Sequence, residues 1–218
     1  MTSTAATGMA SRTLYLARHG DAPGDEGELS ADGRRQAAYL GKRLRGVPLS
    51  AIHHGPQARA RETAEIVAAH RPDRADGPRL ALRPCDSAGD YVPYLPERRE
   101  VPAGLPESTW EWLLQLPERE RLPGPELARD ALRRFTGAVP GEAARHELVV
   151  THNFVIGWLV REALDAPDWR WIGLHHANAA LTIIHYAPEQ PSSLIVYNDI
   201  RHLPEELRWT GFPPGLRV

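Results

Sequence analysis

The tripeptide Arg18-His19-Gly20 places a guanidinium beside an imidazole, directly after the apolar run Leu14–Ala17. Such a run predicts a strand, and in open α/β sheets ligands bind at the carboxyl ends of the strands. An arginine binds phosphate oxygens through its planar fork, and a neutral imidazole can attack phosphorus. A histidine at a strand end can instead be an ordinary turn residue, so the tripeptide indicates phosphoryl chemistry only together with other residues.

A second group of basic side chains stands at the start of a predicted helix. Pro56 is typical of a helix start, and Arg59 and Arg61 follow it in the first turn. Positive charge there opposes the helix dipole by about 0.3–1 kcal/mol. A bound anion would reverse the sign, because free backbone N–H groups and a guanidinium then converge on it. We interpret Arg59 as a phosphate ligand and Arg61 as a solvated side chain.

A third block contains His152. The apolar stretch Leu148–Val150 runs through Thr151 into His152, and a helical apolar run, Phe154–Leu164, follows. His152 therefore stands at a second predicted strand-to-helix junction, like His19. A lone junction histidine is often only hydrogen-bonded locally, and the combination of the three blocks is what indicates a site.

The three blocks, in this order, resemble the histidine phosphatase superfamily, also called the phosphoglycerate mutase-like family. The segment Leu29–Ala37 is similar to the Leu-Thr-x-x-Gly-x-x-Gln-Ala spacer of that family, and the resemblance extends from about Thr13 to Tyr186. It implies that His19 is a catalytic nucleophile that becomes phosphorylated, and that the residues around the phosphoryl group are Arg18, Arg59 and the second catalytic histidine, His152. Because arginines supply the positive charge, no metal and no cofactor are expected.

The family usually takes a proton for the leaving group from a carboxylic acid after the third strand. The stretch Leu80–Pro84 predicts that strand, and Asp86 and Asp90 follow it. We predict Asp90 as the catalytic acid and Asp86 as the second choice. Either carboxylate can instead cap a turn or pair with a nearby arginine.

Other histidines invite a metal hypothesis that the spacing does not favour. The pairs His53-His54 and His175-His176 are adjacent in sequence, and neighbours on a strand point to opposite faces of the sheet. We therefore predict no metal site. His176 or Asn178, just before a late strand, can still reach the phosphate pocket from the end of the sheet.

The chain alternates predicted strands and helices. This predicts an α/β fold, a three-layer α/β/α sandwich whose central sheet is mostly parallel. The expected strands are 14–18, 49–53, 80–84, 148–151, 179–186 and 193–197, and the expected helices are 30–46, 56–70, 125–135 and 154–164. We expect residues 1–12 to be disordered and residues 13–218 to form one domain.

The stretch from about 85 to 125 is dense in proline and also holds Trp110 and Trp112. Proline removes ladder hydrogen bonds, so this stretch cannot be the core of a sheet. It predicts a lid-like insertion of loops and short helices at the carboxyl ends of the strands. The two tryptophans are then in a position to stack on an organic substrate.

Composition narrows the class of partner. The 218 residues carry a net charge of −2, which gives no basic field for nucleic acid or an anionic membrane. Cys85 is the single cysteine, so no intramolecular disulfide is possible, and this suits a cytoplasmic protein. Residues 1–10 lack the basic and apolar regions of a signal peptide. We expect a small phosphorylated substrate as the partner, and the sequence does not indicate an oligomeric state.

Three functions are consistent with these features. The leading hypothesis is a metal-independent phosphomonoesterase that hydrolyses a small phosphorylated metabolite. The first alternative is a phosphohistidine protein phosphatase, because the run from Arg18 to Ala22, Arg-His-Gly-Asp-Ala, resembles short bacterial members with that activity. The second alternative, from another class, is a catalytically silent phosphate-binding module.

Overall fold

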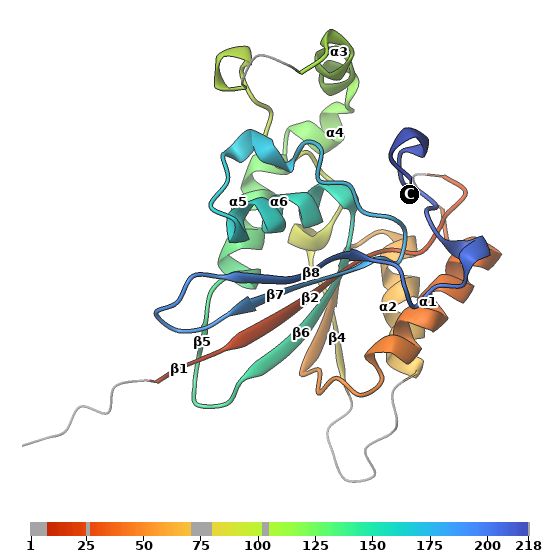
Figure 1. Ribbon diagram of the computed structural model, residues 1–218, viewed down its shortest axis with the longest axis vertical. Coiled ribbons are helices and arrows are strands. Elements are labelled where there is room, and N and C mark those ends of the chain that lie inside the picture. Colours follow the sequence, from red (N-terminus) through yellow and green to blue (C-terminus); the bar gives the residue numbers. More distant parts are fainter. Residues whose placement is uncertain (1–7, 25–26, 71–79, 102–104, 218) are drawn as a thin grey trace, which may run out of the picture.

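The strand β2 (Arg12–Arg18) is buried on both faces, which is typical of a strand inside a parallel sheet. Leu14 and Leu16 point into one apolar cluster, whereas Tyr15 and Ala17 point into another on the opposite face. The computed structural model describes residues 8–24, 27–70, 80–101 and 105–217. Two hydrophobic cores therefore sandwich one sheet, and Figure 1 shows how helices and sheet are arranged.

The sheet has six strands in the order β4-β3-β6-β2-β7-β8. β2 pairs in parallel with β6 (Arg145–Thr151), β6 with β3 (Ala51–His54), and β3 with the edge strand β4 (Ala81–Pro84). On the other side of β2, β7 (Leu181–Tyr186) pairs antiparallel with β2, and β8 (Ser193–Asp199) pairs antiparallel with β7. This confirms the predicted α/β sandwich with a mostly parallel sheet.

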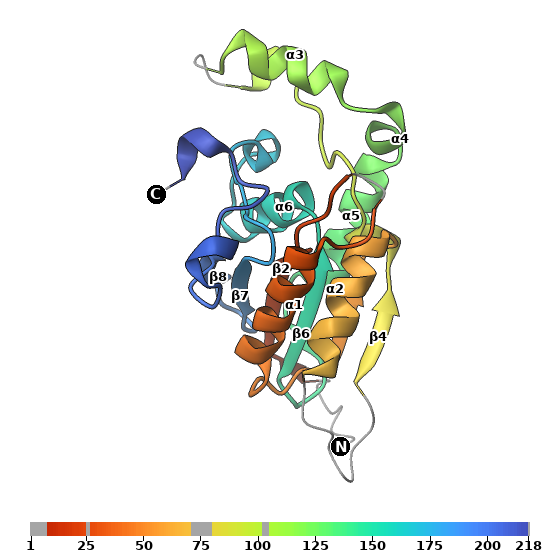
Figure 2. The same ribbon diagram turned by 90° about the vertical axis from the view of Figure 1, so that its right-hand side faces the viewer.

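Helices cover both faces of this sheet. α1 (Ala31–Leu44) and α2 (Ala58–Ala69) lie on one face (Figure 2), and α5 (Gly124–Phe135) and α6 (Asn153–Ala163) pack on the other. α1 begins where expected, because the Ser30 side chain accepts a hydrogen bond from the backbone N–H of Gly33 at 2.9 Å.

The proline-rich insertion folds into short helices rather than strands. It contains η1 (Asp86–Ala88), η2 (Arg98–Glu100), α3 (Glu107–Gln115) and α4 (Glu118–Arg121). Pro106 and Pro117 are the N-cap residues of α3 and α4, so their missing N–H groups cost no helical hydrogen bond. In Figure 1, α3 and α4 rise above the carboxyl ends of the parallel strands, where the lid-like insertion was predicted.

The prediction that residues 1–12 are disordered is wrong for its last residues. β1 (Met9–Ala10) pairs antiparallel with β5 (Val139–Pro140) in a small second sheet, and Arg12 already belongs to β2. Ala10 is buried, and the Arg12 guanidinium contacts the Glu147 carboxylate at 3.1 Å. These contacts come from distant parts of the chain, so residues 1–12 alone gave no sign of them. Residues 1–7 lie outside the described residues, and the single domain expected over 13–218 stays a prediction.

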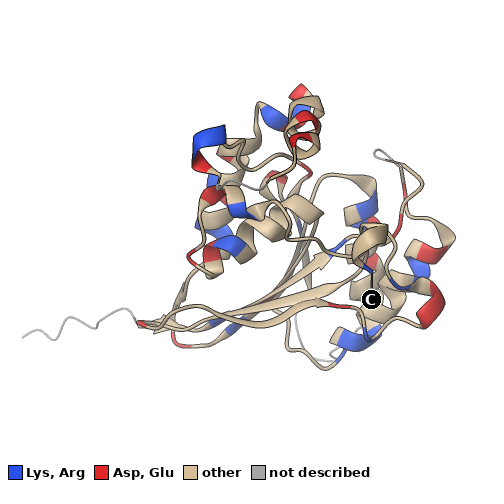
Figure 3. Ribbon diagram, turned by 45° about the horizontal axis from the view of Figure 1, so that its top comes forward, with Lys and Arg blue, Asp and Glu red and all other residues tan. Residues whose placement is uncertain are grey.

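The remaining 3-10 turns follow α6 and the sheet: η3 (Asp168–Trp171), η4 (Glu205–Leu207) and η5 (Pro214–Leu216). Acidic and basic residues are interspersed over the helices in Figure 3. Within the described ranges, no helix is long and apolar enough to cross a bilayer.

Candidate active site

His19 lies directly after β2, and its ring is held in one orientation. Its Nδ1 lies 2.7 Å from the Gly20 carbonyl oxygen, which can only accept, so Nδ1 carries the proton and donates it. The lone pair is therefore on Nε2, which accepts a hydrogen bond from Arg59 Nε at 3.2 Å. Burial, together with the charges of His152 and Arg18, holds the pKa of His19 well below its ordinary value. His19 is therefore a neutral imidazole, and the electron pair on its Nε2 accepts the hydrogen bond from Arg59.

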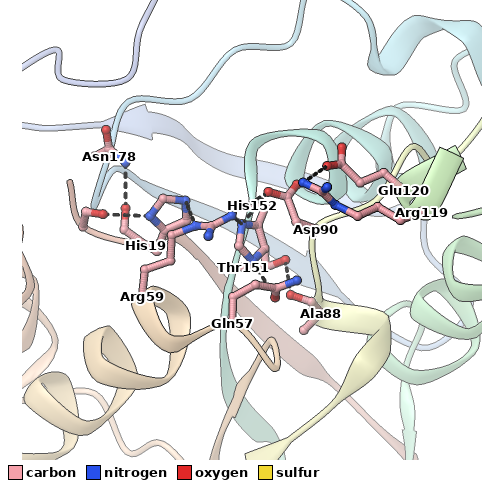
Figure 4. A network of polar contacts seen from close by, with 11 residues as sticks. His19, Gln57, Arg59, Ala88, Asp90, Arg119, Glu120, Thr151, His152 and Asn178 are labelled. Atoms are coloured by element: carbon pink, nitrogen blue, oxygen red, sulfur yellow. Dashed lines mark hydrogen bonds and ion pairs between the residues drawn. The ribbon is translucent and has the colours of Figure 1, made fainter. Parts of the chain in front are cut away.

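Arg59 and His152 stand beside His19, although they come from different elements (Figure 4). Arg59 is in the first turn of α2, and His152 is the N-cap residue of α6. The rings of His19 and His152 are 4.9 Å apart, and Arg59 Nη2 lies 3.4 Å from His152 Nδ1. Both side chains are buried, and burial also lowers the pKa of His152 although Asp90 opposes this. The junctions predicted from sequence therefore bring these groups together.

Asp90 reaches the same cluster from the loop after η1. Its Oδ2 contacts Arg59 Nη2 at 2.8 Å and His152 Nδ1 at 3.2 Å. Burial alone would raise the pKa of Asp90, but its contacts with His152 and Arg59 outweigh burial and hold that pKa well below its usual range. Asp90 is brought into the cluster that contains His19, and in this arrangement it is a carboxylate rather than an acid.

The position of Asp90 depends on η1. Thr151, at the end of β6, donates a hydrogen bond from Oγ1 to the Ala88 carbonyl at 2.7 Å. Tyr91, the residue after Asp90, is buried and donates its hydroxyl to the Ser87 carbonyl at 2.9 Å. The backbone before Asp90 is thereby fixed to β6, and the residue after it is fixed to η1.

Arg18 closes the other side of the cluster. Its Nη1 donates to the carbonyl oxygens of His176 at 2.8 Å and Gly211 at 2.6 Å. Burial lowers the pKa of Arg18 to about 10, so the guanidinium remains charged at neutral pH. Its Nε is buried and has no hydrogen-bond partner among the described residues.

Of the remaining predicted site residues, two contact the cluster and one does not. Asn178 contacts the backbone of His19 rather than its ring, because its Nδ2 donates to the His19 carbonyl at 3.1 Å. His176 is fully buried and meets the cluster through its backbone carbonyl, while its ring packs against Tyr197. Asp86 is exposed and lines a different cavity, so the second choice of acid is not brought to His19.

An open cavity of about 490 Å³ lies above His19. Its walls come from four regions: the strand ends, the insertion, the start of α6 and the C-terminal segment. The lining residues are Arg18, His19, Asp90, Leu116, Pro117, Glu120, His152, Asn153, Phe154, His175, Gly211, Phe212 and Pro213. Neither tryptophan of the insertion is among them. Trp112 packs edge-on against Phe154, and Trp110 lies under the Arg98 guanidinium.

Sequence reasoning missed two kinds of residue. Gln57, the N-cap of α2, contacts His152 Nε2 with Oε1 at 3.1 Å, and a polar residue two positions before Arg59 was a usable signal. Gly211 and Phe212 lie far along the chain, and nothing in their neighbourhood marked them. No group of three or more metal-ligating side chains is found in the described part of the chain.

A neutral buried imidazole between two guanidiniums, at the strand ends of an α/β sheet, is typical of proteins that hold phosphoryl groups. The chain belongs to the histidine phosphatase superfamily, branch 1, whose family model matches residues 14–199. This confirms the family indicated by the sequence motifs.

Curated relatives include the protein named serine/threonine-protein phosphatase Pgam5, mitochondrial, of Caenorhabditis elegans. The two are 30% identical over 207 residues, which cover 89% of this chain and 65% of that protein. The chain therefore spans just under two thirds of the length of this relative.

Solved structures show the same fold. Bacillus stearothermophilus YhfR is 27% identical with a TM-score of 0.61, over 88% of this chain and 98% of that chain. The alpha-ribazole phosphatase of Shigella flexneri is 18% identical with a TM-score of 0.58, over 86% of this chain and 96% of that chain. The second likeness, at this identity, concerns the fold alone.

Proposed function

We propose that this chain is a metal-independent phosphomonoesterase that hydrolyses a small phosphorylated metabolite through a phosphohistidine on His19. The observation that carries the proposal is the state of His19, whose lone pair on Nε2 lies where Arg59 and His152 converge. A phosphate-binding module needs the cations but has no use for an oriented nucleophile. This geometry therefore favours catalysis over silent binding.

The reaction has two steps in this site. His19 Nε2 attacks phosphorus, and the bond from phosphorus to the leaving oxygen breaks while Arg18 and Arg59 balance the phosphoryl charge. The leaving oxygen takes a proton from Asp90, the carboxyl group that contacts Arg59 and His152, which becomes protonated when the substrate is bound. Water then attacks the phosphohistidine and gives a proton to the Asp90 carboxylate, the N–P bond breaks, and inorganic phosphate leaves with neutral His19 restored.

The size of the cavity supports a small substrate. Its volume of about 490 Å³ falls within the range of about 300–1,000 Å³ that is common for small-molecule sites. Leu116, Pro117 and Phe212 line the cavity together with His19, so part of its wall is apolar. A second candidate is a serine/threonine phosphoprotein phosphatase, which the name of the Pgam5 relative favours.

The phosphoenzyme is the first test. After rapid mixing with ³²P-labelled substrate and alkaline quenching, acid-labile label should appear on His19. His19→Ala should lose the label and on the order of 10³-fold or more in turnover, because no other group forms the intermediate. His54→Ala is the matched control, since His54 also ends a strand and bonds the next carbonyl, that of Gly55, but does not line the cavity. Label retained in folded His19→Ala contradicts the mechanism.

A substrate comparison separates the alternatives. Phosphorylated metabolites, a phosphoserine peptide and a phosphohistidine peptide are assayed without added metal and again with EDTA. The highest kcat/KM on a metabolite, unchanged by EDTA, is the expected result. A preference for the phosphoserine or the phosphohistidine peptide would mean that the substrate is a phosphoprotein and not a small metabolite. Phosphate binding with no turnover of any substrate would favour the catalytically silent phosphate-binding module.

A further inference from the structure

The segment Trp209–Pro213 belongs to the wall of the active-site cavity. Gly211, Phe212 and Pro213 line the cavity together with Arg18 and His19. The family model ends at residue 199, so this segment lies outside the matched part of the chain. A part of the site is therefore contributed by residues that the family match does not include.

Two hydrogen bonds hold Thr210 of this segment, one from Asn178 and one from Gln36 of α1, and Gln36 also binds Leu207 just before the segment. The Asn178 backbone N–H donates to the Thr210 carbonyl at 2.9 Å. Gln36 Nε2 donates to Thr210 Oγ1 at 2.7 Å and to the Leu207 carbonyl at 2.8 Å. The other end of the fully buried Gln36 amide accepts from the Asp21 N–H at 2.8 Å. One side chain thus ties the segment to the loop that follows His19.

The anchored segment places the Gly211 carbonyl against the Arg18 guanidinium. Its carbonyl accepts from Arg18 Nη1 at 2.6 Å, and the same nitrogen also donates to the His176 carbonyl. A guanidinium has five N–H donors in a rigid plane, so fixing Nη1 fixes the direction of the others. Arg18 Nε, buried and without a partner among the described residues, is one of the donors that remain.

Position 211 accepts only glycine without disturbing this arrangement. Its φ of +65° lies in the left-handed region, where a Cβ is disfavoured. A Cβ there would lie 2.2 Å from Asn178 Oδ1 and 2.7 Å from Arg18 Nη1. Asn178 itself donates to the His19 carbonyl, so a side chain at this position displaces both neighbours of the nucleophile.

We propose that Gly211 is a positioning residue of the active site, whose carbonyl orients the Arg18 guanidinium toward the phosphoryl group. The C-terminal segment Trp209–Pro213 then contributes to the active site by holding Arg18. This inference rests on the proposed function, because it takes the bound anion to be a phosphoryl group.

The test measures anion binding and hydrolysis separately. Orthovanadate affinity is measured by calorimetry, and p-nitrophenyl phosphate hydrolysis gives kcat/KM. Gly211→Ala should weaken vanadate binding about 10-fold and lower kcat/KM about 100-fold, because a displaced arginine no longer meets the anion in the productive geometry. In the Arg18→Lys background the same change should alter vanadate binding by less than about 3-fold, because the guanidinium that it displaces is gone.

Two glycines provide matched controls. Gly137 has a φ of +75° with no atom within 4 Å of an added Cβ, so Gly137→Ala reproduces the backbone strain alone. Gly215 lies in the same C-terminal region, again with nothing within 4 Å. Both variants should keep wild-type vanadate affinity.

Two results overturn the proposal: unchanged vanadate binding in folded Gly211→Ala, or equal weakening in the wild-type and Arg18→Lys backgrounds. If Gly211→Ala does not fold, Thr210→Val replaces it, since it removes the hydroxyl that Gln36 binds and leaves the glycine in place. The same comparison of the two backgrounds then applies. A wild-type chain that binds vanadate but hydrolyses no phosphomonoester overturns the proposed function and leaves the vanadate comparison valid.

Discussion

The Asp90 carboxylate lies between the two side chains that the phosphoryl group is expected to meet. Its contacts with Arg59 and His152 lower its pKa, so it cannot give up a proton in the free protein. A bound phosphate dianion would take those partners and place like charge beside the carboxylate. Both changes raise a carboxyl pKa, so Asp90 can become an acid only once substrate is bound.

This double role predicts opposite effects of Asp90→Asn on binding and on catalysis. Inorganic phosphate should bind several-fold more tightly at pH 7.5, because the neutral amide competes less for Arg59. Hydrolysis of alkyl phosphates should fall far more than hydrolysis of p-nitrophenyl phosphate, whose leaving phenolate needs no proton. Calorimetry and steady-state kinetics measure the two effects.

Asp86→Asn serves as the control, since Asp86 lies in another cavity and should change neither quantity. Weaker phosphate binding in Asp90→Asn would show that the carboxylate supports the anion site rather than competing for it. Equal loss on both esters would leave Asp90 with no role as an acid.

The sequence predicted those site residues whose positions follow from short local patterns. Arg18, His19, Arg59 and His152 each stand at the end of a strand or the start of a helix, and parallel strands bring such ends to one edge of the sheet. The charge state of Asp90 could not be predicted from the sequence, because it depends on contacts with Arg59 in α2 and His152 at the start of α6. Gly211 was missed for the same reason, since its contact with Arg18 spans nearly the whole chain.

At the scale of elements, the start of α1 is packed directly against the backbone that follows His19. A Cβ at Gly33 would lie 2.0 Å from the Asp21 carbonyl oxygen, and one at Gly20 would lie 2.5 Å from the Gly33 carbonyl oxygen. Helix and loop therefore touch backbone to backbone. Gly33 of the Leu29–Ala37 motif has no Cβ, and this permits the close approach.

Gly33→Ala should therefore separate α1 from the loop and destabilise the protein by about 1–3 kcal/mol, the usual cost of overpacking. Chemical denaturation measures the change. Gly46→Ala, just beyond the other end of α1, meets no atom within 4 Å and should leave the unfolding free energy within about 0.5 kcal/mol of wild type. A Gly33→Ala variant as stable as Gly46→Ala contradicts the close approach.

The elements themselves were predictable to within a few residues at most boundaries. Both-face burial explains the continuous apolar runs of β2 and β6, and Ser30 marks the start of α1 by its side-chain bond. β1 was not predictable, because its two residues are a strand only through pairing with β5. Short helices were expected in the insertion, but their bounds could not be predicted, because such short elements give no clear periodic signal.

At the scale of the whole molecule, burying neutral imidazoles links folding to pH. Burial, with the nearby charge of Arg18, lowers the pKa of the fully buried His176 to about 3, and the ordinary value is 6.5. Between these values the unfolded chain binds a proton at this position and the folded chain does not. Stability therefore rises with pH in this window and is lost as pH falls below 6.5.

His176→Leu should consequently reduce the pH dependence of stability between pH 7 and pH 5. One pKa unit corresponds to about 1.4 kcal/mol, so His176 should lower the unfolding free energy by about 2 kcal/mol between pH 6.5 and pH 5. Carboxylates titrate below this window, and the lowered pKa of His19 acts in the same direction in both proteins. Urea unfolding of wild type and variant at pH 7, 6 and 5 gives the two slopes. Equal slopes would mean that His176 gains a proton or a solvent contact in the folded protein, and that the packing of its ring against Tyr197 does not keep it neutral.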